Sequence, residues 1–84
     1  MSSIDKNEAI IIDVRTTGEF NEGANPLSIN IPLNLIPVKI NEFNKEQAII
    51  LCCASGGRSE SALNFFIANG FKNVVNAGPW QNTL

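Results

Sequence analysis

Two short apolar segments, Ala9–Val14 and Gln47–Cys52, limit what this chain can fold into more than any other feature. Isoleucine dominates both segments, and neither shows the strict alternation of apolar and polar residues that marks a half-exposed strand. A strand without that alternation is covered on both faces, as the strands of parallel sheets are. We therefore predict that the two segments lie in the same buried sheet.

The residues after the first segment predict a short helix and a short strand. Thr16, with Glu19 three residues later, has the spacing of a capping box, which predicts a helix that begins there and ends by Gly23. The segment Ser28–Ile31 is expected to form a strand that Pro32 stops.

The rest of the chain continues to alternate helices with strands. That alternation predicts an α/β fold with a small, mostly parallel sheet. The remaining expected elements are a helix from about Leu35 or Pro37 to Phe43, a helix over Ser59–Asn69 closed by a left-handed Gly70 with Phe71 as its hydrophobic contact, a strand over Asn73–Asn76 and a closing loop over Ala77–Trp80.

Length and composition predict one compact folded domain over residues 1–84. Apolar residues make up 44% and charged residues 17%, which is the balance of a globular protein, and no apolar run is long enough to cross a bilayer. The segment Met1–Glu8 holds two acidic residues and no apolar stretch, so we expect no secretory signal peptide. The expected location is the cytoplasm.

Charge and cysteine content exclude several kinds of partner and site. The net charge is −2 and the six Lys and Arg residues are scattered, which argues against nucleic acid and against acidic membranes. The chain has no histidine, and its two cysteines are adjacent, so we expect neither a structural disulfide nor a bound metal, and no cofactor.

The chemistry-bearing segment follows the second apolar strand. A cysteine at the end of a buried strand, a glycine-containing loop and a helix start form an arrangement in which amide N–H groups converge on an anion. Such amides, with a nearby cation, stabilise a thiolate, which is the nucleophilic form of cysteine. The candidate nucleophile is Cys53, the candidate loop and substrate-binding residues are Ala54, Ser55, Gly56, Gly57, Arg58 and Ser59, and Arg58 is the expected cation.

These residues resemble a known family, because Cys53–Ser59 matches the C-x-x-G-x-R-S active-site loop of rhodanese-like domains. Other blocks agree with that family in the same order. They are Ile12-Asp13-Val14-Arg15 followed by Glu19-Phe20, then Ile29–Leu33, and after the loop Gly70-Phe71, Asn73-Val74, Gly78 and Trp80. The resemblance therefore covers roughly residues 10–80, and a loop match supported by several ordered blocks is far more specific than the loop alone.

The resemblance implies a three-layer α/β fold, with helices flanking the sheet, and a sulfurtransferase of the thiosulfate type. In that reaction Cys53 attacks the outer sulfur of a donor such as thiosulfate, and the resulting persulfide passes its sulfur to cyanide, a thiol or a protein cysteine. Arg58 would orient the anionic donor. The expected partners are a small sulfur donor or acceptor and possible protein thiols, and we expect a monomer.

Two residues in the segment have a structural interpretation beside the functional one. Alternation along a strand turns Cys52 to the face opposite Cys53, so we expect Cys52 to be a small buried apolar residue, with a resolving role as the lesser alternative. Arg58 is assigned to the site, with a salt bridge to Asp13 or Glu19 as its alternative.

Other polar residues are expected to support the site. We predict that Asp13, Arg15 and Glu19, which follow the first central strand, mostly brace the loop from below. Ser59 fits two roles equally well, the N-cap of the helix and a hydrogen-bond donor to the sulfur. Trp80 is interpreted as a lid on the core rather than a substrate contact.

Two other functions compete with the sulfurtransferase. Cys52 and Arg58 have the C-x5-R spacing of tyrosine phosphatases and arsenate reductases, but the phosphatase loop needs glycine at position 55, where this chain has Ser55. The second alternative is a rhodanese-like module that only binds or relays sulfur to one partner. The complete loop favours catalysis over a module that has lost its cysteine.

Overall fold

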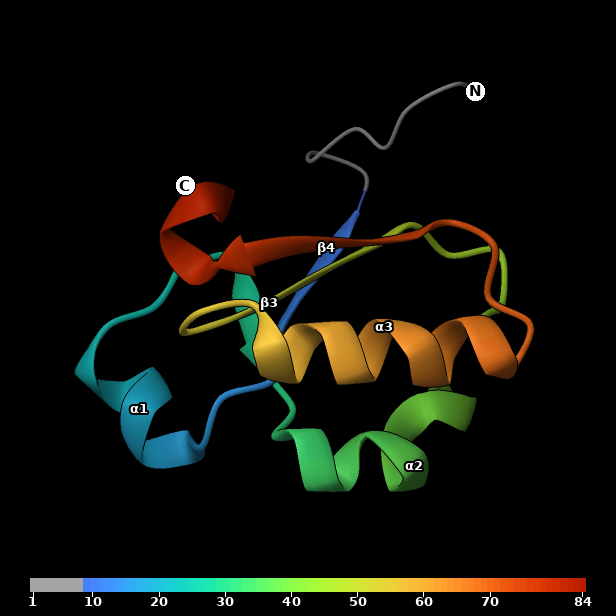
Figure 1. Ribbon diagram of the computed structural model, residues 1–84, viewed down its shortest axis with the longest axis horizontal. Helices are drawn as coiled ribbons and strands as arrows, with labels where there is room; N and C mark the ends of the chain where they lie inside the picture. The colour runs from blue at the N-terminus through green and yellow to red at the C-terminus, as the bar shows by residue number, and fades with distance from the viewer. Residues whose placement is uncertain (1–8) are drawn as a thin grey trace.

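The computed structural model describes residues 9–84, and the expectation for Met1–Glu8 lies outside them. At its centre is one four-stranded sheet in the order β2-β1-β3-β4, in which every neighbouring pair is parallel (Figure 1). The predicted α/β fold with a parallel sheet is confirmed. The strands are β1 (Ile10–Asp13), β2 (Ser28–Asn30), β3 (Ile49–Cys53) and β4 (Val74–Pro79).

The first helix, α1 (Thr17–Glu22), begins at the predicted capping box. The Glu19 amide donates to Thr16 Oγ1 at 3.2 Å, and the Thr16 amide donates back to Glu19 Oε1 at 3.0 Å. Because the first amides of a helix lack intrahelical partners, this exchange fixes where α1 starts. The helix ends at Gly23, as predicted.

The second helical segment is less regular than predicted. A 3-10 turn over Leu33–Leu35 leads into α2 (Ile36–Lys39), and a second 3-10 turn over Ile40–Glu42 follows. Only one turn is therefore α-helical, with Pro37 in its first turn, where a missing amide hydrogen costs nothing. None of the helices within residues 9–84 is long and apolar enough to cross a membrane.

The third helix, α3 (Gly57–Ala68), starts two residues earlier than predicted and ends one residue earlier, with Asn69 as its C-cap. The Gly70 amide donates to the Ile67 carbonyl and the Phe71 amide to the Phe66 carbonyl, and Gly70 has φ +91°. These two bonds define a Schellman cap. The expected hydrophobic contact is present, since the rings of Phe66 and Phe71 meet edge to face at 4.9 Å.

The last strand is longer than predicted, and the prediction of a closing loop over Ala77–Trp80 is wrong. Leu51 pairs with Asn76 and Cys52 pairs with Gly78, so Ala77 is an extra residue on β4. Such a bulge lets the strand continue through residues with weak strand propensity, and Gly78 accepts the left-handed φ of +80° there. The 3-10 turn Trp80–Thr83 follows.

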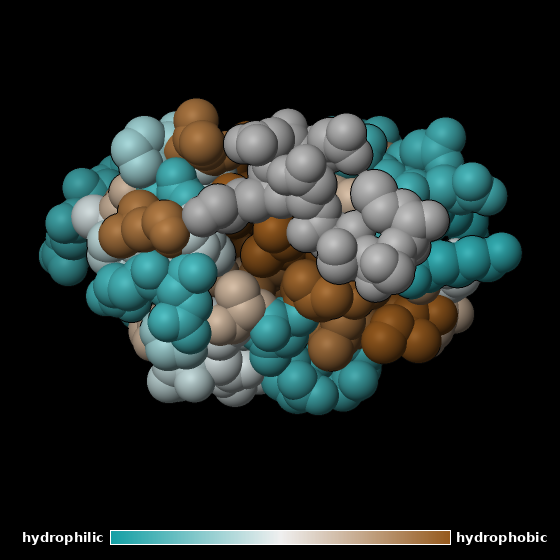
Figure 2. All heavy atoms as spheres, turned by 90° about the horizontal axis from the view of Figure 1, so that it is seen from above, coloured by the Kyte–Doolittle hydropathy of each residue, from teal (hydrophilic) through white to brown (hydrophobic). Residues whose placement is uncertain are grey.

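The sheet separates two apolar clusters. Helices α2 and α3 lie on one side of it (Figure 1), and under them Ile12, Leu51, Cys53 and Phe66 are at most 1% exposed. Ile11, Ile50 and Cys52 form the cluster on the other side, with Ala9, Ala77 and Trp80 packed against it. Figure 2 shows apolar side chains at the surface on that second side. The two cysteines therefore face opposite sides of the sheet, as predicted.

Candidate active site

The candidate site lies where the two central strands end. The neighbours of β1 are β2 on one side and β3 on the other, so the chain leaves β1 and β3 at a point where the strand order changes direction. In open parallel sheets this point forms a crevice at the carboxyl ends of the strands, where ligands bind. Cys53 is the last residue of β3, and Asp13 is the last residue of β1.

The sulfur of Cys53 is the centre of a ring of hydrogen bonds. The Gly56 amide donates to Cys53 Sγ at 2.9 Å and the Ser59 amide at 3.4 Å, while Ser59 Oγ lies 3.3 Å from the same sulfur. Cys53 is 1% exposed, so the loop of residues 54–58 surrounds its side chain. Ala54, Ser55 and Gly57 form the exposed part of that loop.

A left-handed glycine makes this ring possible. Gly56 is the N-cap residue of α3, has φ +101°, and donates its amide hydrogen to the sulfur. A side chain at this φ would be strained, while a Cβ itself would make only an ordinary contact, 3.5 Å from the Cα of Gly78. Ser59 is the third residue of α3, so its predicted N-cap role is wrong and its contact with the sulfur is the one observed.

The environment of Cys53 favours the thiolate. Burial acts to raise the pKa of the thiol, but hydrogen bonds from the Ser59 side chain and from the Ser59, Gly56 and Ser55 amides outweigh it, and the pKa lies below its ordinary value. Hydrogen bonds to the charged form lower an acid's pKa. The loop can therefore hold an anionic sulfur. No group of three or more metal-ligating side chains lies together within residues 9–84.

Arg58 occupies a different position from the one expected of a cation beside the sulfur. Its guanidinium makes two hydrogen bonds to Glu19, with Nη1 2.7 Å from Oε1 and Nη2 3.0 Å from Oε2. The hydrogen bond from Arg58 is the main cause that lowers the pKa of Glu19 to about 2. The amides and Ser59, rather than Arg58, are therefore the groups that stabilise the thiolate directly.

Asp13 and Arg15 form a buried pair behind the loop. Arg15 Nη2 and Nε donate to the Asp13 carboxylate at 2.7 and 3.0 Å. Arg15 also donates to the carbonyls of Glu19 and Gly23, and its guanidinium lies 5.2 Å from the centre of the Trp80 ring. The pair thereby ties the end of β1 to α1, which carries Glu19. The bracing role of these residues stays a prediction.

The structure adds Asn76 to the residues around the loop. Asn76 Oδ1 accepts from Ser59 Oγ at 2.6 Å and from the Gly78 amide at 2.8 Å, and its Nδ2 donates to the Gly56 carbonyl at 3.3 Å. It lies on β4, 17 residues beyond Ser59, so no local spacing connects it to the loop. The sequence pattern predicted this residue only at the end of a short strand.

Cys52 is separated from the loop by the sheet itself. It is fully buried among Ile11 and Ile50 on the opposite side from Cys53. Burial raises the pKa of the Cys52 thiol to about 12, so this cysteine stays protonated. A phosphatase loop from Cys52 to Arg58 would need the Cys52 thiolate inside the ring, and the geometry gives that alternative no support.

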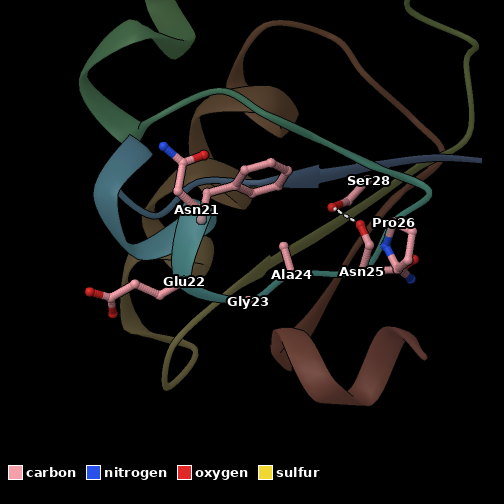
Figure 3. A pocket seen from close by; sticks show the side chains of 8 residues that line it. Asn21, Glu22, Gly23, Ala24, Asn25, Pro26 and Ser28 are labelled. Carbon is pink, nitrogen blue, oxygen red and sulfur yellow. Dashed lines mark hydrogen bonds between the residues drawn. The ribbon is translucent and has the colours of Figure 1, made fainter.

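Several shallow hollows lie around the site. One of about 290 Å³ borders the loop at Arg58 and continues along Val14, Pro32 and Leu33. Another of about 280 Å³ lies on the other side of the ion pair, with Glu19, Arg15 and Trp80 in its wall. A larger one of about 490 Å³ follows the end of α1 and the segment up to Ser28 (Figure 3) and includes no residue of the Cys53 loop.

Comparison with known proteins gives consistent relatives. The model of the family described as "Rhodanese-like domain" matches residues 1–77. A protein named "Sulfurtransferase" from Allochromatium vinosum is 31% identical over 86% of this chain and 67% of its own length. A "Putative sulfur carrier protein YrkF" from Bacillus subtilis is 36% identical over 90% of this chain and 42% of its own length. The chain thus spans between 42% and 67% of these two relatives.

A solved structure supports the same assignment. The crystal structure of a rhodanese-like domain protein from Staphylococcus aureus is 32% identical, has a TM-score of 0.79 and covers all of this chain, which in turn covers 92% of that structure. The family model, the curated relatives and this structure agree with the order of motifs found in the sequence. The resemblance is thereby confirmed, and this chain belongs to the family of rhodanese-like domains.

Proposed function

We propose that this domain is a sulfurtransferase that moves sulfane sulfur through a persulfide on Cys53. The observation that carries the proposal is the environment of the Cys53 sulfur, which accepts a 2.9 Å hydrogen bond from the Gly56 amide inside the loop. A cysteine held as a thiolate in this way is the activated nucleophile of covalent catalysis. Relatives named sulfurtransferase and sulfur carrier support the same chemistry.

The first half of the reaction loads the sulfur. The Cys53 thiolate attacks the outer sulfur of thiosulfate, a new S–S bond forms, and the bond within thiosulfate breaks so that sulfite leaves with its electron pair. The product is the Cys53 persulfide, and no external oxidant or reductant is needed. Arg58 lies at the side of the loop, where it would meet the anionic end of the donor when it turns from Glu19.

The second half discharges the sulfur. Cyanide or the thiolate of an acceptor attacks the outer sulfur of the persulfide, and the electron pair of the broken S–S bond returns to Cys53 Sγ. The Gly56 and Ser59 amides then stabilise the negative charge that returns to Cys53 Sγ, since both already donate hydrogen bonds to that atom. Donors aimed at a position where charge develops lower the barrier of such a step.

Sulfur relay to a partner protein is the second candidate function. Arg58 is held in two hydrogen bonds by Glu19, so the loop presents no unpaired cation from this residue to a small dianion. A protein persulfide or protein thiol would not depend on such a cation. We also propose a monomer as the acting form and the cytoplasm as the location, since a reducing compartment keeps cysteines such as Cys52 and Cys53 free.

The test is the intact mass of the protein after incubation with thiosulfate. We expect a mass increase of about one sulfur atom that a reducing agent removes. Cys53→Ser should abolish the increase completely, because it removes the attacking atom.

Cys52→Ser is the matched control, since it changes the neighbouring thiol on the opposite side of the sheet. It should load sulfur as the unmodified protein does. Loss of loading in both variants would contradict the assignment of the nucleophile. No increase with thiosulfate, but an increase with a protein persulfide, would favour the relay.

A further inference from the structure

The hydroxyl of Ser59 has more acceptors around it than it has hydrogens. Ser59 Oγ lies 2.6 Å from Asn76 Oδ1, 3.2 Å from the Gly56 carbonyl and 3.3 Å from Cys53 Sγ. A hydroxyl carries one hydrogen, so it donates to one of these atoms at a time. The shortest contact is the one to Asn76, so Asn76 Oδ1 competes with the sulfur for the Ser59 hydrogen.

The orientation of the Asn76 amide is fixed by its other partners. The Gly78 amide donates to Asn76 Oδ1 at 2.8 Å, and Nδ2 donates to the Gly56 carbonyl at 3.3 Å and to Glu60 Oε1 at 3.1 Å. A reversed amide would set Nδ2 against the Gly78 amide, with two donors facing each other. The side-chain oxygen of Asn76 is therefore the atom presented to Ser59.

The bulge in β4 sets this geometry. Asn76 pairs with Leu51, whose side chain lies in the same cluster as Cys53, so Asn76 faces the side of the sheet that holds the sulfur. The extra residue Ala77 then lets Gly78 turn its amide back toward the Asn76 side chain. A regular strand would not place an amide donor there.

We propose that Asn76 is a positioning residue for the sulfur chemistry: its oxygen holds the Ser59 hydroxyl hydrogen while Cys53 Sγ is uncharged and releases it to the sulfur when Sγ becomes a thiolate. The proposal rests on the proposed function of Cys53. When the sulfur is a thiol or the inner atom of a persulfide, it is a weak acceptor, and the hydroxyl stays with Asn76. When discharge returns an electron pair to Sγ, the hydroxyl turns to the anion.

Competition for one hydrogen tunes the nucleophile. With Asn76 present, Ser59 gives the thiolate less stabilisation than it could, so Cys53 keeps more of the basicity that makes a thiolate reactive. The charged groups near this network are Glu60, which Asn76 contacts, and Arg58 with its partner Glu19. Asp13 lies behind the loop, paired with Arg15. Among these groups, only Glu60 loses a hydrogen bond when the Asn76 side chain is shortened.

The test measures the pKa of Cys53 from the ultraviolet absorbance of the thiolate, in variants that remove each partner. Asn76→Ala should lower this pKa by about half a unit to one unit, because Ser59 then donates to the sulfur without competition. Ser59→Ala should raise it by about one unit. In the double variant, Asn76→Ala should lower the pKa no further, because the hydroxyl through which it acts is gone.

Asn73→Ala is the control, since Asn73 precedes the same strand but donates to the Glu46 carbonyl, away from the site. It should leave the pKa of Cys53 unchanged. If Asn76 only held the loop together, Asn76→Ala would loosen the Gly56 amide and raise the pKa. That result, no change, or an equal lowering in the Ser59→Ala background would overturn the proposal.

Asn76→Asp provides a second measurement should the alanine variant fold poorly. Aspartate has nearly the same shape and accepts the hydroxyl hydrogen more strongly, so the pKa of Cys53 should rise, and part of the rise should vanish in the Ser59→Ala background. A rise of equal size in both backgrounds would overturn the proposal. The pKa does not depend on any donor or acceptor of sulfur, so a failure of sulfur transfer and a failure of this proposal are separate results.

Discussion

Arg58 and Glu19 are adjacent at the side of the loop, and each neutralises the other's charge. Both side chains are 37% exposed, and the pKa of Glu19, lowered to about 2 chiefly by its hydrogen bond from Arg58, keeps the carboxylate ionised at any ordinary assay pH. The pair therefore persists across the working range of the protein. An anionic sulfur donor that approaches Arg58 has to compete with a carboxylate already bound to it.

Glu19→Gln should therefore improve the use of thiosulfate. Glutamine can still serve at its position in the capping box, so α1 should keep its start, while Arg58 loses its charged partner. We expect the KM for thiosulfate to fall by about two- to fivefold, the range that an exposed ion pair supports. Steady-state kinetics with thiosulfate and cyanide give the measurement.

Glu22→Gln is the matched control, with the same charge change on the same helix. It should alter the KM for thiosulfate much less. Equal effects from both substitutions would mean that net charge alone governs donor binding, and that the Glu19–Arg58 contact has no part in it.

At the residue level, the sequence predicted the candidate nucleophile but not all of its neighbours. Local spacing was enough to associate Cys53, Gly56 and Ser59, because one strand end and one helix start hold all three. Asn76 could not be found in this way. Its place beside Ser59 depends on the register of β4, which a bulge shifts by one residue, and no pattern within one segment reports a shift between two strands.

At the level of elements, α3 is bounded at each end by a glycine with positive φ. Gly56 precedes the helix with φ +101°, and Gly70 follows it with φ +91°. The two serve different purposes, because the Gly56 amide donates to Cys53 Sγ while Gly70 closes the Schellman cap with Phe71. The strand–loop–helix unit is thus defined by two backbone positions that resist any side chain.

Replacing each glycine by alanine should separate these purposes. Gly56→Ala and Gly70→Ala should each lower the free energy of unfolding by about 1 kcal/mol, the cost of a left-handed residue with a Cβ. Only Gly56→Ala should also reduce the rate of sulfur loading, because its amide points at the sulfur. Urea unfolding and the mass assay measure the two effects.

An equal loss of loading in both alanine variants would contradict this assignment. It would mean that loading follows overall stability rather than the position of the Gly56 amide. Gly70 is the suitable comparison, because a Cβ there would meet only the flexible side chain of Lys45, at 3.4 Å.

The elements differ in how well the sequence predicted them. The capping box of α1, the Schellman cap of α3 and the two isoleucine-rich strands were predicted because each depends on neighbouring residues. The Leu33–Glu42 segment divides into three short helical pieces, and β4 continues to Pro79. Both outcomes depend on packing against the sheet, which propensity alone does not describe.

For the whole molecule, one helix–sheet interface carries most of the packing beneath the site. Phe66 is fully buried there, whereas its neighbour Phe65 is 36% exposed. Burial of a large side chain contributes about 2–3 kcal/mol, and a chain of 84 residues has a total stability near the lower end of about 5–15 kcal/mol. Truncation of a single side chain in this interface therefore removes a large part of the total free energy of unfolding.

Phe66→Ala should lower the free energy of unfolding by about 3–5 kcal/mol, because it leaves a cavity beside Phe71 as well as losing burial. Phe65→Ala, one position away on the same helix, should cost less than about 1 kcal/mol. Urea denaturation followed by circular dichroism compares the two. Similar losses of stability would show that α3 turns a different face toward the sheet from the one described.

The opposite placement of the two cysteines bears on how long transferred sulfur stays on the domain. A second thiol beside Cys53 would attack the persulfide from within the same chain, form a disulfide and expel hydrogen sulfide. Cys52 is kept from doing so by the thickness of the sheet. Under the proposed function, discharge is then a second-order event whose rate follows the concentration of the acceptor. In the absence of an acceptor, the loaded form becomes a reservoir rather than a passing intermediate.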